Sequence, residues 1–135
     1  MRRILILTIA AALTAAACGG SDTAVESRLE TVGFDEFAGL IDDRPQDLVI
    51  LDVRTAEEYA EAHIPGAVML DFYSSTFRQD LDTLFKEAPI ALYCRSGNRS
   101  GQALEIMREL GFTDVRNLDG GIITWAENGG SLESG

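Results

Sequence analysis

Short apolar runs along this chain alternate with segments whose apolar residues recur at helical spacing. Two continuous runs, Leu48–Leu51 and Ile90–Tyr93, lie shortly after prolines and are typical of strands buried on both faces of a sheet. A shorter run at Ala67–Met69 follows Pro65-Gly66, a pair that interrupts regular secondary structure. Together with a segment around Val115–Leu118, these runs predict the strands of a sheet.

The intervening segments predict helices. The first predicted helix carries the stripe Phe34, Phe37 and Ile41, and the second begins with the capping box of Thr55 and Glu58 and runs through Tyr59. A weaker helical pattern, Phe77, Leu81, Leu84 and Phe85, predicts the third. The fourth runs from about Arg99 to Leu110, and a short fifth helix runs through Trp125. Gly111 is well placed to end the fourth helix, and Gly120-Gly121 predicts a turn before the fifth. Alternating strands and helices indicate an α/β domain with a mainly parallel sheet, in which ligands bind at the carboxyl ends of strands.

The first residues are typical of an export signal. Arg2 and Arg3 precede an uncharged run from Ile4 to Ala17, which is shorter than the roughly 18 residues that a membrane-spanning helix needs. The run ends at Cys18 and resembles a bacterial lipoprotein signal, although Ala15 stands where leucine is common. We expect residues 1–17 to be removed and Cys18 to be acylated, which would anchor the protein by lipid in the bacterial cell envelope, facing the periplasm or the outside. An ordinary secretory signal is the alternative.

The rest of the chain predicts one domain. Residues 18–27 form a lipidated N-terminus and flexible tether, residues 28–130 the folded domain and residues 131–135 a C-terminal tail. The 22 acidic and 11 basic residues give a net charge of -11. A surface with this excess of acidic residues repels phosphate groups, so the composition excludes a nucleic-acid-binding function.

One polar loop carries most of the candidate chemistry. Cys94 follows a predicted strand and precedes a predicted helix, so backbone N–H groups and the positive end of the helix dipole would face its sulfur. Arg95 and Arg99 add positive charge, which predicts a lowered thiol pKa and a nucleophile at neutral pH. Gly97 allows the positive φ that curls the loop. The alternative is a buried, inert cysteine, but the polar, arginine-flanked loop argues against burial in apolar surroundings.

From Cys94 to Arg99 the sequence resembles the active-site loop of single-domain rhodanese-like sulfurtransferases. Further landmarks of that family follow the same order within roughly residues 30–130, namely Leu51-Asp52-Val53-Arg54 with Glu57-Glu58-Tyr59, His63-Ile64-Pro65-Gly66-Ala67, and Leu118-Asp119-Gly120-Gly121 with Trp125. The resemblance implies a central parallel sheet flanked by helices on both sides. It also implies that Asp52 and Arg54 form a polar network that supports the loop, whereas the residues alone leave a solvent-facing ion pair equally open.

The resemblance further implies a ping-pong reaction. Cys94 would take sulfur from a small anionic donor such as thiosulfate, hold it as a persulfide, and pass it to cyanide or a thiol. The residues expected to bind the donor are Arg95, Ser96, Gly97, Asn98 and Arg99. We expect no cofactor and no metal. His63 is the single histidine, which excludes a multi-histidine site, and a Cys/His/carboxylate site is conceivable but has no supporting ligand spacing. The resemblance favours a structural, hydrogen-bonded role for His63 over a role as a catalytic base.

Two other functions stay open at this point. Cysteine phosphatases use a related but longer loop, whereas only four residues separate Cys94 from Arg99 here. Tyr93 also stands where those enzymes commonly place a histidine. The second alternative is a persulfide carrier or a non-catalytic binding module that serves a protein partner, which the sequence does not identify.

Overall fold

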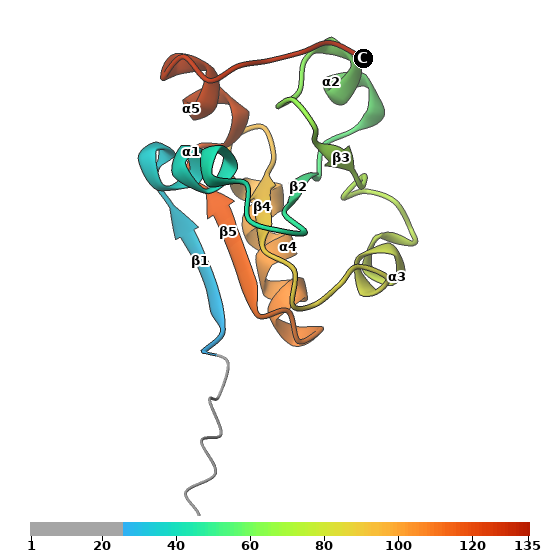
Figure 1. The fold of residues 1–135 in the computed structure, drawn as a ribbon. Coiled ribbons are helices and arrows are strands. Elements are labelled where there is room, and N and C mark those ends of the chain that lie inside the picture. The colour runs from blue at the N-terminus through green and yellow to red at the C-terminus, as the bar shows by residue number, and fades with distance from the viewer. Residues whose placement is uncertain (1–25) are drawn as a thin grey trace, which may run out of the picture.

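Five parallel strands form the centre of the protein, and helices cover both of its faces (Figure 1). The computed structural model describes residues 26–135. The strands are β1 (Arg28–Val32), β2 (Val49–Asp52), β3 (Val68–Met69), β4 (Ile90–Tyr93) and β5 (Asp114–Leu118). They lie in the order β1-β5-β4-β2-β3, and every neighbouring pair is parallel. The predicted fold class, a parallel sheet flanked by helices on both sides, is confirmed.

The helices fall into two groups by the face that they cover. They are α1 (Phe34–Asp43), α2 (Ala56–Glu61), α3 (Phe77–Asp82), α4 (Asn98–Glu109) and α5 (Gly121–Glu127). Apolar residues of α3 and α4 pack in one core cluster with side chains such as Leu51 and Leu92. Those of α1 and α5 pack in a second cluster with the alternate strand residues, such as Ile50 and Tyr93. Successive strand residues point to opposite faces, which explains why the strand runs are apolar throughout.

The sequence pattern missed one strand and extended one helix too far. β1 was not predicted because only Leu29 and Val32 are buried in it, as expected for an edge strand that pairs with β5 alone. The predicted third helix included Phe85, which is wrong, since α3 ends at Asp82 and Phe85 is 81% exposed. The Lys86 ammonium donates to the Asp82 carbonyl oxygen (3.0 Å), satisfying a main-chain group at the end of this helix.

The last residues of the chain lie against α2. The main-chain groups of His63 and Glu133 bond to each other in both directions (2.8 and 2.9 Å), and the Trp125 indole N–H donates to the Ser131 carbonyl oxygen. This is the segment predicted as a C-terminal tail. The predicted signal sequence, the acylated Cys18 and most of the tether lie outside the described residues. Within residues 26–135, no helix is long and apolar enough to cross a membrane.

Candidate functional site

Cys94 lies at the carboxyl edge of the sheet, directly after the central strand β4. The loop that follows is short, and α4 begins at Asn98. Gly97 has a φ of 97°, so the predicted left-handed conformation is confirmed. This curl directs main-chain N–H groups at the start of α4 back toward the cysteine. The positive end of the α4 dipole faces the same place.

The sulfur of Cys94 accepts hydrogen bonds from the loop and from α4. The Gly97 main-chain N–H donates to Sγ at 3.1 Å, and the Ser100 hydroxyl donates at 3.3 Å. Burial acts to raise the pKa of the Cys94 thiol, but the Ser100 hydroxyl and the amides of Ser100, Gly97 and Ser96 outweigh it. The pKa of Cys94 therefore lies below its ordinary value, because these donors bind the thiolate better than the thiol.

Cys94 is nevertheless buried, which differs from the expectation drawn from its polar neighbours. The residue is only 1% exposed and belongs to the core cluster under α3 and α4. Burial follows from β4 being a central strand: the side chain after Tyr93 points to the α4 face, and the loop folds over it. The polar character of the loop predicted its hydrogen bonds to sulfur but not the depth of the sulfur.

Ser100 is a site residue that the sequence analysis did not include. Its side chain is buried, and its hydroxyl contacts only Sγ among the side-chain hydrogen bonds of the described residues. The first turn of α4 places this hydroxyl over the sulfur. The available signal was the position of a small hydroxyl residue one helical turn after Gly97, where it faces back over the loop.

The Gly120-Gly121 turn supports the loop from the other side. The N–H groups of Ile122 and Ile123 donate to the carbonyl oxygens of Cys94 (2.9 Å) and Arg95 (3.3 Å). A Cβ atom at Gly121 would lie 2.5 Å from the Cys94 carbonyl oxygen and 2.6 Å from that of Arg95. The predicted turn is confirmed, and its close approach to the loop also explains why glycine is needed there.

The two loop arginines have different surroundings. Arg99 donates from both terminal nitrogens to the two oxygens of Glu58, each at 2.7 Å. Arg95 is exposed, and it has no ion pair among the described residues. Ser96 and Asn98 are exposed as well. Arg95, Ser96 and Gly97 lie in the loop, whereas Asn98 and Arg99 lie in the first turn of α4. The sequence did not predict that Arg99 is paired with a carboxylate from α2.

Asp52 and Arg54 form a buried ion pair beside the site. Their side chains are 0% and 5% exposed, and Arg54 Nη2 lies 2.7 Å from Asp52 Oδ2. The same nitrogen donates to the Ala62 carbonyl oxygen, and the guanidinium lies over the Tyr93 ring (5.6 Å). The solvent-facing alternative is excluded by this burial. The pair connects the end of β2 with α2 and with the residue that precedes Cys94.

His63 is a hydrogen-bonded structural residue, as predicted. Its Nδ1 lies 2.8 Å from the Tyr59 carbonyl oxygen, and its ring stacks on the Tyr59 ring with centroids 3.7 Å apart. Trp125 is buried in the core cluster under α1 and α5. Within residues 26–135, no group of three His, Cys, Asp or Glu side chains is placed to hold a metal ion.

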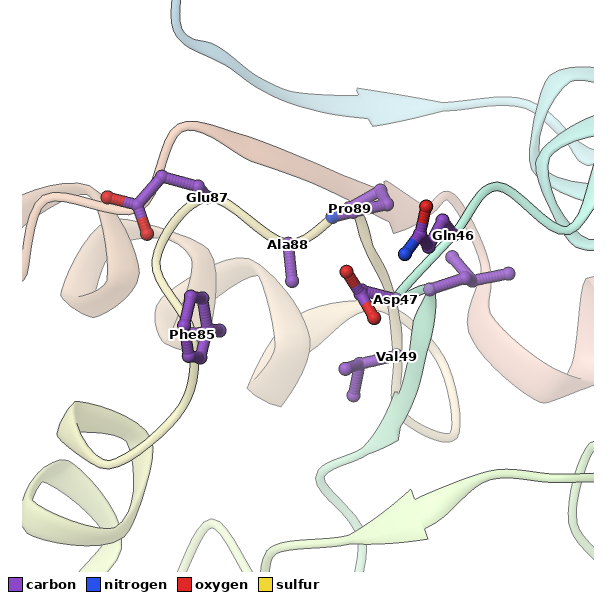
Figure 2. A pocket seen from close by; sticks show the side chains of 8 residues that line it. Gln46, Asp47, Val49, Phe85, Glu87, Ala88 and Pro89 are labelled. Carbon is purple, nitrogen blue, oxygen red and sulfur yellow. The ribbon is translucent and has the colours of Figure 1, made fainter.

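Two cavities lie at opposite edges of the sheet. The larger, about 570 Å³, lies where β2 and β4 begin, and Figure 2 shows its lining by Asp47, Phe85 and Pro89 among others. The smaller, about 200 Å³, lies between α2 and α5 and is lined in part by Arg54, Glu58 and Ile123. The smaller cavity therefore adjoins the Cys94 loop, because Glu58 and Ile123 both bond to loop residues.

Comparison with known proteins gives concordant results. The family described as "Rhodanese-like domain" matches residues 34–128. A sulfurtransferase of Allochromatium vinosum is 38% identical over 84 residues, which are 62% of this chain and 77% of that protein. The thiosulfate sulfurtransferase GlpE of Pseudomonas fluorescens is 39% identical over 83 residues, or 61% of this chain and 73% of that protein. The crystal structure of a rhodanese-like domain protein from Staphylococcus aureus is 28% identical, with a TM-score of 0.66 over 78% of this chain and 98% of that chain.

Proposed function

Because the chain belongs to the rhodanese-like family, we propose that it is a sulfurtransferase in which Cys94 carries the transferred sulfur as a persulfide. One observation carries the proposal: the buried Cys94 Sγ accepts hydrogen bonds from the Gly97 N–H and the Ser100 hydroxyl. Such donors stabilise a sulfur anion inside a site that excludes water. The relatives named as sulfurtransferases support the same reaction class.

In the first half of the proposed reaction, the Cys94 thiolate attacks the outer sulfur of a donor such as thiosulfate. The S–S bond of thiosulfate breaks, sulfite leaves with the electron pair, and an S–S bond to Cys94 forms. The negative charge then lies on the outer sulfur of the persulfide. Under this proposal, the loop amides would stabilise this charge, and the hydrogen bond from the Gly97 N–H to Cys94 Sγ supports that role.

In the second half, a thiophilic acceptor attacks the outer sulfur. We propose cyanide or a thiol for this role; the acceptor forms the new bond to sulfur, and the Cys94 thiolate leaves. A lowered pKa makes Cys94 a good leaving group as well as a nucleophile. Where the acceptor is a particular protein thiol, the chain would act as a carrier, forming the persulfide while showing little turnover with cyanide.

Intact mass spectrometry after incubation with thiosulfate tests the proposal. We expect a mass increase of one sulfur atom that disappears when cyanide or a thiol is added. The Cys94→Ser variant should show no increase, whereas Cys18→Ser, which alters the other cysteine of the chain, should show it unchanged. A mass increase that survives in Cys94→Ser would overturn the assignment of the nucleophile.

Kinetics separate the enzyme from the alternatives. Rapid persulfide formation together with comparable steady-state turnover indicates an enzyme, whereas rapid formation with slow turnover indicates a carrier. Aryl phosphate hydrolysis that exceeds sulfur transfer from thiosulfate would instead show a cysteine phosphatase. Absence of a persulfide with several sulfur donors, in a folded protein, would leave only a binding module.

We also propose that the protein is exported and anchored by lipid on Cys18. The basic residues Arg2 and Arg3, the apolar run after them and the position of Cys18 support this proposal. Metabolic labelling with a fatty acid should mark the protein, and Cys18→Ser should abolish the label and release the protein from the membrane fraction. An unlabelled protein in the soluble fraction would contradict the anchor.

A further inference from the structure

Glu58 contacts the Cys94 loop through an interaction that the proposed reaction does not use. Its two carboxylate oxygens accept from the two terminal nitrogens of Arg99, each at 2.7 Å. Glu58 is itself fixed at the start of α2, because it forms a capping box with Thr55. The Thr55 N–H donates to Glu58 Oε2 (3.1 Å), and the Glu58 N–H donates to Thr55 Oγ1 (3.4 Å). A bidentate pair held at both ends is well ordered.

The pair is also largely removed from solvent. The side chains of Arg99 and Glu58 are 14% and 25% exposed, so water screens their charges less than it screens a surface pair. Arg99 is held further by the Tyr73 ring, 5.6 Å from its guanidinium carbon. The Glu58 carboxylate holds the pKa of Arg99 well above its usual range. The Arg99 guanidinium also interacts electrostatically with the Cys94 sulfur. The guanidinium is therefore charged, but its charge is cancelled close by.

The other charges around the loop leave one unbalanced cation. Arg54 is paired with Asp52, and Tyr93 is neutral at physiological pH because burial raises the pKa of its hydroxyl. Arg95 is exposed and has no ion-pair partner within the described part of the chain. Among the loop's two arginines, Arg95 alone therefore presents an uncompensated charge to an anion that approaches the sulfur.

We propose that Glu58 is a charge-balancing, positioning residue of the sulfur-transfer site: it cancels the charge of Arg99, so that Arg95 attracts the anionic donor while Arg99 holds the loop. This inference rests on the proposed function and refines it by dividing two tasks between the arginines. The physical consequence is a compromise. A second free cation beside the sulfur would bind thiosulfate more tightly, but it would also lower the thiol pKa further and so make the Cys94 thiolate a weaker nucleophile.

Charge neutralisation in a double-mutant cycle tests the proposal. Glu58→Gln preserves the size of the side chain and the capping box, which accepts glutamine, but frees the charge of Arg99. Arg99→Gln has the opposite effect, since it leaves Glu58 unbalanced. The double variant carries neither charge. The pH dependence of Cys94 alkylation by iodoacetamide, a neutral reagent, reports the thiol pKa in each protein and needs no sulfur transfer.

We expect the thiol pKa to fall in Glu58→Gln, to rise in Arg99→Gln and to return toward that of the unaltered protein in the double variant. We expect each single variant to change the ionisation constant of the thiol by about tenfold at low salt and by less at high salt. If Glu58 only supported the fold, both single variants would shift the thiol pKa in the same direction. The thiol pKa of the double variant would then be no closer to that of the unaltered protein. That result would overturn the proposal.

Donor kinetics supply the second readout. The KM for thiosulfate should fall in Glu58→Gln, whereas structural damage would raise the KM. Arg95→Gln should raise the KM for thiosulfate and should shift the thiol pKa less than Arg99→Gln does, because water screens the exposed Arg95 side chain more strongly. Glu57→Gln is the matched control, because this exposed carboxylate of α2 has no ion-pair partner among the described residues and does not line the smaller cavity. An equal KM in Glu58→Gln and Glu57→Gln would overturn the proposal. Absence of any persulfide would refute the proposed function and leave the alkylation result to decide the role of Glu58.

Discussion

The carboxyl and amino edges of the sheet both carry a cavity, yet they are built differently. At the carboxyl edge the cavity is small, about 200 Å³, and Arg54 of the buried ion pair contributes to its lining. It adjoins the loop of Cys94, whose buried sulfur accepts directed hydrogen bonds. At the amino edge it is larger, about 570 Å³, but its lining combines apolar side chains with the carboxylates of Asp47 and Glu87 (Figure 2). Size alone would therefore point to the wrong edge.

The difference follows from the direction of the chain in a parallel sheet. Helices that follow strands begin at the carboxyl edge, so their unpaired N–H groups and positive dipole ends gather there. The amino edge receives the other ends of the helices and offers no such donors. Polar groups such as Asp52 and Arg54 can be buried at the carboxyl edge only because they satisfy one another. The following variants test whether substitutions at the two edges differ in their effects on the free energy of unfolding and on the chemistry of Cys94.

The largest effect is expected from Asp52→Asn. The substitution removes the charge that balances the buried Arg54 guanidinium, and loss of one partner of a buried ion pair destabilises a fold by roughly 3–5 kcal/mol. Urea unfolding at neutral pH should show this as a lower midpoint with an unchanged slope. Glu87→Gln at the amino edge is the matched control and should stay within about 0.5 kcal/mol of the unaltered protein. Equal midpoints for the two variants would show that the buried Asp52–Arg54 pair contributes no more to stability than an exposed carboxylate does.

Gly121→Ala should have the next largest effect, and it should act on function as well as stability. Alanine at a φ of 61° is strained, and its Cβ would approach the Cys94 carbonyl oxygen to 2.5 Å. The loop must move, so we expect persulfide formation with thiosulfate to be largely lost. Gly129→Ala is the control, because Gly129 has a φ of 79° but open space around it. That variant should lose only about 1–2 kcal/mol of stability and keep its persulfide, as measured by unfolding and intact mass.

The carboxyl edge was also the part of the molecule that the sequence described best. The strand β4, the positive φ of Gly97 and the start of α4 are local features, since each is encoded by an apolar run, a glycine or a helical stripe. The features that the sequence did not predict are long-range contacts. Nothing in the spacing of Glu58 and Arg99 shows that α2 approaches the loop, because the ion pair joins residues 41 positions apart.

The errors have physical reasons of the same kind. β1 forms a strand because it pairs with β5, whose residues lie far along the chain. Its own sequence is mostly polar, so the local pattern does not predict a strand there. The burial of Cys94 depends on how α4 folds over the sheet, which a polar loop composition does not reveal. Phe85 has an apolar side chain at helical spacing and is nevertheless exposed, since α3 ends before it. Periodicity identifies which residues can be buried, whereas tertiary packing decides which are.

Ser100→Ala should have a smaller effect, confined to the thiol. Loss of the hydroxyl that donates to Sγ at 3.3 Å should raise the pKa of Cys94 by about one unit, since a hydrogen bond to a charged group is worth about 1.5 kcal/mol. The thiolate fraction at neutral pH falls, so iodoacetamide alkylation should slow up to about tenfold there and be unchanged at alkaline pH, where the thiol is fully ionised.

Ser96→Ala is the matched control for Ser100→Ala. Ser96 is exposed and acts on the thiol through its main-chain amide, which the substitution keeps. The pKa of Cys94 should therefore be nearly the same in this variant as in the unaltered protein. Equal alkylation profiles for Ser96→Ala and Ser100→Ala would show that the hydroxyl of Ser100 does not set the thiol pKa and that the main-chain amides act alone.

The smallest effect is expected at the amino edge, where Phe85→Ser should change neither stability nor chemistry. Phe85 is 81% exposed, so little apolar surface is lost, and the free energy of unfolding should stay within about 0.5 kcal/mol. Phe77 of α3, only 5% exposed, provides the contrast, because Phe77→Ser should lose roughly 3–5 kcal/mol or more. Persulfide formation in Phe85→Ser should match that of the unaltered protein. A slower reaction would mean that the larger cavity communicates with Cys94 across the sheet, and the functional division between the two edges would then be wrong.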